Sequence, residues 1–79
     1  MSGYLAATVA AAALVARFPM ALAKAARFDE DTSRLAAQAG ATEAAVVVEL
    51  ARRAAVHPEA DLEDLVVVLG AAIAEGSWP

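Results

Sequence analysis

The fold class depends on residues 45–69, AVVVELARRAAVHPEADLEDLVVVL. This stretch holds two valine-rich runs, residues 45–50 and 65–69, which are short, β-branched and apolar. Hydropathy alone does not separate a buried strand from a buried helix in such runs. Their flanks, ELARRAA and EADLEDL, are rich in strong helix formers and contain no glycine. We therefore predict helices at both runs, with strands as the alternative, and an all-α fold.

Capping residues predict a small bundle of four or five short helices, which form a single domain over residues 1–79. Carboxylates and hydroxyls satisfy the free amides at a helix start, whereas glycine favours a helix end. The cluster Asp29–Ser33 therefore predicts the start of a short third helix, which ends at Gly40. Asp61 and Asp64 form a capping arrangement for the last helix. The expected helices cover about residues 2–18, 19–28, 35–39, 42–56 and 61–76.

The apolar faces of the last two expected helices are wider than one neighbour can cover. On the last helix a clear stripe forms at helical spacing, and Val67 and Val68 fall outside it. The stripe consists of Leu62, Leu65, Val66, Leu69 and Ile73. On the preceding helix the apolar arc spans about 200°, and Glu49, Arg52 and Arg53 mark the side that faces water. We expect that the helices are sandwiched within the domain, or that a second apolar face meets another subunit.

Residues 5–28, LAATVAAAALVARFPMALAKAARF, raise the question of a membrane segment. The uncharged run, residues 1–16, is shorter than the ~20 residues that a spanning helix needs. No positive charge precedes this run, as it would in a secretory signal. A helix that is apolar all round is typical of a buried helix. We therefore expect residues 5–18 to be buried in the bundle or at a subunit seam, where a charge at Val9 would unfold or dissociate the protein.

Composition and charge indicate that the chain oligomerises or binds a partner. Of its 48 apolar residues 24 are alanine, so burial alone falls short of the entropy cost of ordering 79 residues. The chain has no cysteine that could form disulfides, and small proteins in this position commonly oligomerise or dock on a partner. Residues 1–28 carry a charge of +3 and residues 29–79 carry −7. This division suits an anionic surface, or the acidic half of the same or a neighbouring chain.

The sequence contains no pattern that indicates catalysis. His57 is its single histidine and precedes a proline, no serine lies in a nucleophile motif, and no glycine-rich phosphate loop is present. The acidic residues between Glu59 and Asp64 suit the first turns of a helix, where negative charge is favoured, better than a cation site. We therefore expect no enzymatic activity, no cofactor and no metal.

Residues 34–54, RLAAQAGATEAAVVVELARRA, have the outline of a helix-turn-helix with Gly40 in the turn. The second helix would present Glu43, Val47 and Val48, whereas base reading needs hydrogen-bond donors and phosphate contacts need cations. We keep a DNA-binding regulator as an alternative, although nucleic acid is not the expected partner. A second alternative is a membrane-surface protein, in which Arg17, Lys24 and Arg27 would lie near lipid phosphates.

The sequence thus predicts a cytoplasmic protein–protein interaction or assembly module, which acts as a homo-oligomer or as a small subunit of a larger complex. Trp78 lies just beyond the last helix. We expect it to fold back as the apolar contact that accompanies a glycine C-cap, with an anchoring role in a partner interface as the alternative. The expected interface residues are Leu5, Val9, Val15, Phe18, Val47, Val48, Val67, Val68 and Trp78.

Overall fold

The computed structural model describes residues 2–79, and this part of the chain contains helices and no strand. Both valine-rich runs lie in helices, which confirms the all-α prediction. The two runs are helical and not strands because helix propensity is summed over the whole segment, and their flanks are rich in helix formers. The helices are α1 (Ser2–Arg17), α2 (Pro19–Leu22), α3 (Ala25–Ala39), α4 (Glu43–Val56) and α5 (Leu62–Ala74).

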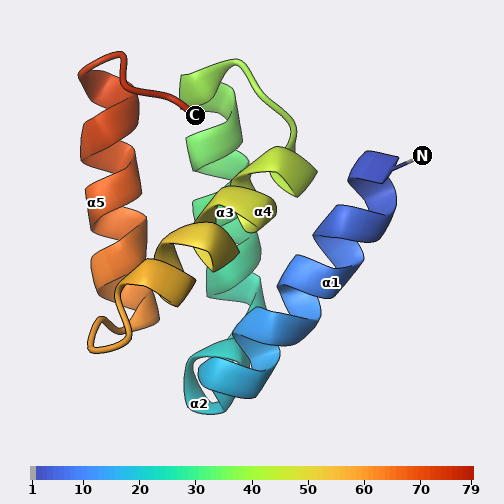
Figure 1. The fold of residues 1–79 in the computed structure, drawn as a ribbon. Coiled ribbons are helices and arrows are strands. Elements are labelled where there is room, and N and C mark those ends of the chain that lie inside the picture. The colour runs from blue at the N-terminus through green and yellow to red at the C-terminus, as the bar shows by residue number, and fades with distance from the viewer. Residues whose placement is uncertain (1) are drawn as a thin grey trace.

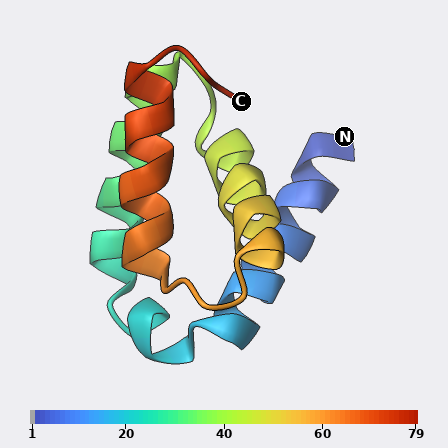
Figure 2. The ribbon, with the colours of Figure 1, turned by 60° about the vertical axis from the view of Figure 1, so that its left-hand side comes forward.

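Helix α4 lies at the centre of the bundle and packs against α1, α3 and α5. Helices α1 and α4 run in broadly the same direction, and α3 and α5 run the opposite way (Figures 1 and 2). Helix α1 packs mainly on α4 and lies on the other side of α4 from α5. As a result, α1 forms the outer wall of the bundle and keeps a long side free of intramolecular neighbours.

Three of the predicted helix boundaries are confirmed by their capping geometry. Gly40 ends α3 in the left-handed conformation, with a φ of 64° that favours glycine. The hydroxyl of Thr42 accepts a hydrogen bond from the amide of Ala45 at 3.1 Å and starts α4. At the start of α5, Asp61 accepts from the Asp64 amide at 2.8 Å, and Asp64 accepts from the Asp61 amide at 3.4 Å. These two bonds form a complete capping box.

The predicted boundaries between residues 19 and 35 are wrong. The second expected helix stops at Leu22, and α3 begins at Ala25 and continues through Asp29–Ser33 instead of starting there. Thr32 is buried inside α3, and its hydroxyl donates to the carbonyl of Asp29 at 3.1 Å. This cluster therefore does not cap a helix, because packing of Thr32 and Leu35 against the bundle overrides the local capping preference.

The core is small and draws on every long helix. The largest fully buried side chains come from α1, α3, α4 and α5, and they are Leu14, Leu35, Leu50, Leu69 and Val46. All five residues of the stripe predicted on α5 are buried, whereas Val67 and Val68 face outward. The prediction of that inward stripe is therefore confirmed. The exposed valines leave α5 with a second apolar face.

Candidate interaction surface

The outward side of α1 is exposed and apolar. Its exposed fractions are 80% for Tyr4, 67% for Leu5, 62% for Val9 and 54% for Val15. Among the described side chains of this helix, Ala10 and Leu14 are the buried ones. Of the two expected locations for residues 5–18, the inside of the bundle is therefore wrong for most of this segment, and a subunit seam stays a prediction. A helix that is apolar all round gives no signal for which side faces inward, and α4 covers one side only.

Helix α1 is fastened to α4 by Arg17, the first charged residue of the chain. Its guanidinium donates hydrogen bonds to the backbone carbonyls of Ala54, His57 and Ala60, the last at 2.9 Å. Carbonyls at a helix C-terminus lack partners and carry partial negative charge, so a cation there is stabilising. The guanidinium also lies 4.9 Å from the centre of the Phe18 ring. Arg17 therefore uses its charge inside the molecule, with the end of α4 as its partner.

The face of α4 that the sequence marks as wet contains a buried carboxylate. Glu49 is 6% exposed, and both of its oxygens accept hydrogen bonds from arginines one turn along the helix. Arg52 donates from Nε and Nη2 at 3.0 and 2.6 Å, and Arg53 donates from Nε at 2.7 Å. The hydrogen bond from Arg52 is the main cause that lowers the pKa of Glu49, against the opposing effect of burial. The prediction that Glu49 faces water is therefore wrong, and this carboxylate offers no free oxygen for catalysis.

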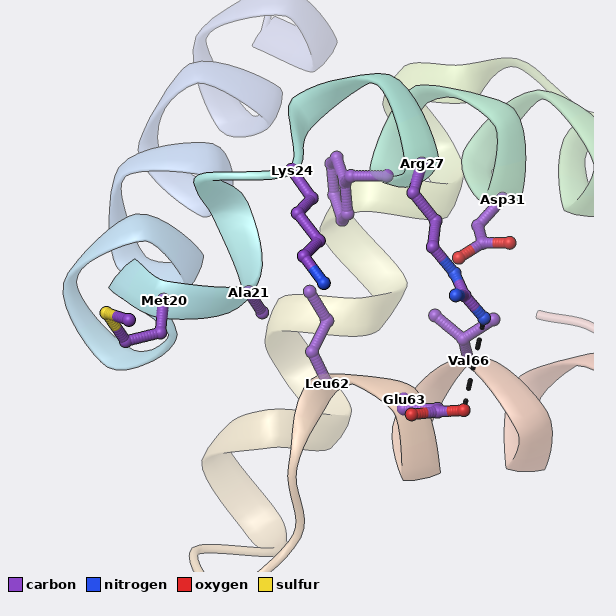
Figure 3. A pocket seen from close by; sticks show the side chains of 9 residues that line it. Met20, Ala21, Lys24, Arg27, Asp31, Leu62, Glu63 and Val66 are labelled. Carbon is purple, nitrogen blue, oxygen red and sulfur yellow. Dashed lines mark ion pairs between the residues drawn. The ribbon is translucent and has the colours of Figure 1, made fainter.

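A hollow of about 300 Å³ lies where α2 and the first turns of α3 and α5 meet (Figure 3). Phe28, Leu62 and Val66 supply apolar lining, and Lys24 and Arg27 reach toward it from above. Its remaining lining residues are Met20, Ala21, Asp31 and Glu63. The volume is at the lower end of the range for ligand pockets.

The charges around this hollow are mixed and partly paired. Arg27 lies 4.0 Å from Glu63, and Asp31 forms an ion pair with Arg34 at 2.9 Å. The Arg27–Glu63 pair joins the positive N-terminal part of the chain to its acidic part, as one of the sequence-based interpretations of the charge division expects. No single ligand charge is favoured by such a rim.

The structure divides the nine predicted interface residues into three groups. Leu5, Val9 and Val15 share the outward side of α1, and Val67 and Val68 lie on α5, beyond α4. The half-buried remainder is Phe18, Val47, Val48 and Trp78. These nine residues therefore do not form one surface, and the α1 group is the larger of the two exposed groups.

Two aromatic residues differ in how well the sequence predicts them. Trp78 packs against the core and lines a hollow beside Ala44 and Val48, which confirms that the tail folds back. Tyr4 is highly exposed on α1 and is missing from the predicted interface. Its helical phase places it on the same side of α1 as Val15, and this phase is the signal that could have found it.

The geometry gives little support to a DNA-binding helix, a metal site or a membrane-spanning helix. Helix α4, which would be the recognition helix of a helix-turn-helix, packs against α1, α3 and α5, so three neighbours cover much of its surface. Within residues 2–79, no three histidine or acidic side chains are placed to hold a metal ion. None of the helices described is both long and apolar enough to span a membrane. No family model, curated protein or solved structure matches the chain, so the geometry alone bears on its function.

Proposed function

We propose that this protein is a non-enzymatic assembly module, which binds another protein chain through the outward side of α1. The bound chain is a second copy or the larger subunit of a complex. One observation carries the proposal. Helix α1 has 16 residues and exposes Tyr4, Leu5, Val9 and Val15, and no charged residue precedes Arg17 at its end. Contiguous apolar patches of this kind mark interaction sites on soluble proteins.

The energetics of this surface support association. Each square ångström of apolar area removed from water contributes about 25 cal/mol. Helix α1 is already formed and is held on α4 by Arg17, so a partner would not have to order it. A preorganised surface keeps more of its burial energy as affinity, because the entropy of ordering is not lost on binding.

Other observations support an activity without chemistry. The oxygens of Glu49 are engaged by arginines, and His57, the single histidine, is exposed at the C-cap of α4. The proposal includes a cytoplasmic protein that works without a cofactor. DNA binding is not favoured, because α4 packs against three other helices and its first turn carries the negative charge of the exposed Glu43.

A charge on the outward side of α1 tests the proposal. Val9→Glu places a carboxylate where the side chain is 62% exposed, so we expect the fold to survive and the assembly to dissociate. The measurement is native mass spectrometry of tagged protein isolated from its source, with circular dichroism of the purified chain as a check on folding. Wild-type protein should appear in a species heavier than the 8.0 kDa chain.

Ala37→Glu is the matched control, because Ala37 is exposed on α3, away from α1. This variant should assemble as the wild type does. The proposal is overturned if the wild-type protein is isolated as a lone 8.0 kDa chain, or if Val9→Glu leaves the assembly intact.

A further inference from the structure

We infer that the chain that covers α1 is a second copy of this protein, packed antiparallel along its own α1. The inference rests on the proposed function and names its partner. Four exposed residues of α1, Leu5, Thr8, Ala12 and Val15, are spaced by three, four and three positions. This spacing is the heptad repeat of a coiled-coil seam. On an α-helix these four side chains fall within an arc of about 80°, opposite the side that carries the buried Ala10 and Leu14.

Thr8 is the polar member of this seam, and its hydrogen bond is already made. Its hydroxyl donates to the backbone carbonyl of Tyr4 at 3.0 Å, within the same helix. Burial of an unpaired hydroxyl would be costly, whereas a hydroxyl bonded inside its own helix leaves no unsatisfied donor. The seam can therefore be covered by an apolar surface without loss of a hydrogen bond.

The positions that flank the seam select the partner. In coiled coils these flanking positions usually carry charges that decide which chains pair. Here they are Tyr4, Val9, Ala11 and Ala16, none of which is charged. A charged partner surface would lose its hydration against this helix and gain no ion pair. An uncharged face of the same width is the matching surface, and a second copy supplies it through a twofold axis.

Side-chain size and helix direction favour the antiparallel arrangement. With the twofold axis at the level of Ala10, Leu5 lies opposite Val15 of the second copy, and Thr8 lies opposite Ala12 of the second copy. The large pairs then close both ends, and the small pairs at the centre let the two backbones approach. Antiparallel helices also place each positive N-terminus beside a negative C-terminus, whereas parallel helices bring like ends together.

Disulfide trapping tests the orientation, and the natural chain has no cysteine to interfere. We would mix equal amounts of the single variants Thr8→Cys and Ala12→Cys under reducing conditions and then oxidise the mixture. Mass spectrometry would give the relative amounts of the disulfide-linked dimers. The antiparallel seam predicts that the heterodimer, in which a disulfide joins one variant to the other, forms several-fold more than either homodimer. A statistical mixture, in which the heterodimer is only about twice as abundant as each homodimer, or an excess of the two homodimers, would overturn the antiparallel arrangement. Ala37→Cys, on the exposed side of α3, should form dimers only slowly.

Light scattering of the purified wild-type chain separates this inference from the proposed function. A homodimer has twice the 8.0 kDa mass of the chain and dissociates on dilution or with Val9→Glu. A purified chain that stays monomeric overturns the inference. If protein from the source is nevertheless assembled, and Val9→Glu disrupts that assembly, the proposed function stands with a different partner. If Val9→Glu has no effect on assembly in either setting, the proposed function fails as well.

Discussion

At the residue scale, two charged side chains do what the sequence does not reveal. Arg17 ends a long uncharged run and looks available to an anionic partner, yet it bonds to two carbonyls at the C-terminal end of α4 and to one in the loop that follows. Glu49 looks solvated, yet α4 packs against three other helices and the carboxylate is buried with two arginines. Both outcomes depend on how α1 and α4 are placed against each other. A single helix pattern carries no information about such tertiary neighbours.

The ion cluster at Glu49 predicts a pH dependence of stability. The hydrogen bond from Arg52, with that from Arg53, holds the pKa of Glu49 below its ordinary value of 4.5. A carboxyl whose pKa is lower in the folded protein than in the unfolded chain stabilises the fold at pH values above its unfolded-state pKa. This stability is lost as the pH falls through the pKa of the folded protein. We expect Glu49→Gln to lower the free energy of unfolding by about 1–2 kcal/mol at pH 7. The gap from wild type should shrink as the pH falls below 4.5.

Urea unfolding of both proteins between pH 7 and pH 3.5 measures this gap. Glu30→Gln is the control, because Glu30 is exposed on α3 and should change stability by only a few tenths of a kcal/mol. A gap between Glu49→Gln and wild type that is the same at both ends of the pH range would contradict the account.

At the element scale, local signals predicted well where they matched the packing. Gly40 ends α3, Thr42 starts α4 and Asp61 starts α5, as the capping chemistry of each residue indicates. The cluster Asp29–Ser33 has the same chemistry, but Thr32 turns its hydroxyl back into α3 and is buried. A capping signal is therefore reliable only where no buried side chain overrides it.

Helix α5 shows which part of a surface the sequence can predict. Its inward stripe was predictable because its large apolar residues, from Leu62 to Ile73, recur at helical spacing. In α1 most positions are alanine or larger apolar residues, so its inward and outward sides look alike in sequence. The two sides differ because α1 packs mainly on α4, and Ala10 and Leu14 are buried in the fold.

Two glycines provide an opposed pair of stability predictions. Gly70 lies inside α5, and a Cβ there would sit 3.5 Å from Cδ2 of Leu35, an ordinary van der Waals distance. Gly70→Ala should therefore raise the free energy of unfolding by about 0.5–1 kcal/mol through helix propensity. Gly40 has a φ of +64°, so Gly40→Ala should lower it by about 1–2 kcal/mol. Urea unfolding measures both, and a destabilised Gly70→Ala would show that α5 and α3 pack more tightly than the structure has them.

At the scale of the whole molecule, two features have separate roles: the division of the chain into a positive N-terminal part and an acidic remainder, and the outer position of α1. The exposed Arg27–Glu63 pair links the positive N-terminal part to α5, and such exposed pairs contribute at most about 1 kcal/mol. The bundle is therefore held by its small core and by the Arg17 contacts. The outward side of α1 takes no part in either, which leaves it available to a second chain.

The central claim is that another chain covers this side of α1. The direct measurement is the relaxation of methyl protons by a soluble paramagnetic probe, recorded over a range of protein concentrations. The methyls of Leu5, Val9 and Val15 should be protected at high concentration and become accessible on dilution or in Ala12→Glu. The methyls of Val67, 66% exposed on α5, serve as the internal reference and should stay accessible throughout. Equal accessibility of Leu5 and Val67 at every concentration, in the purified and the source-isolated protein, would contradict this claim.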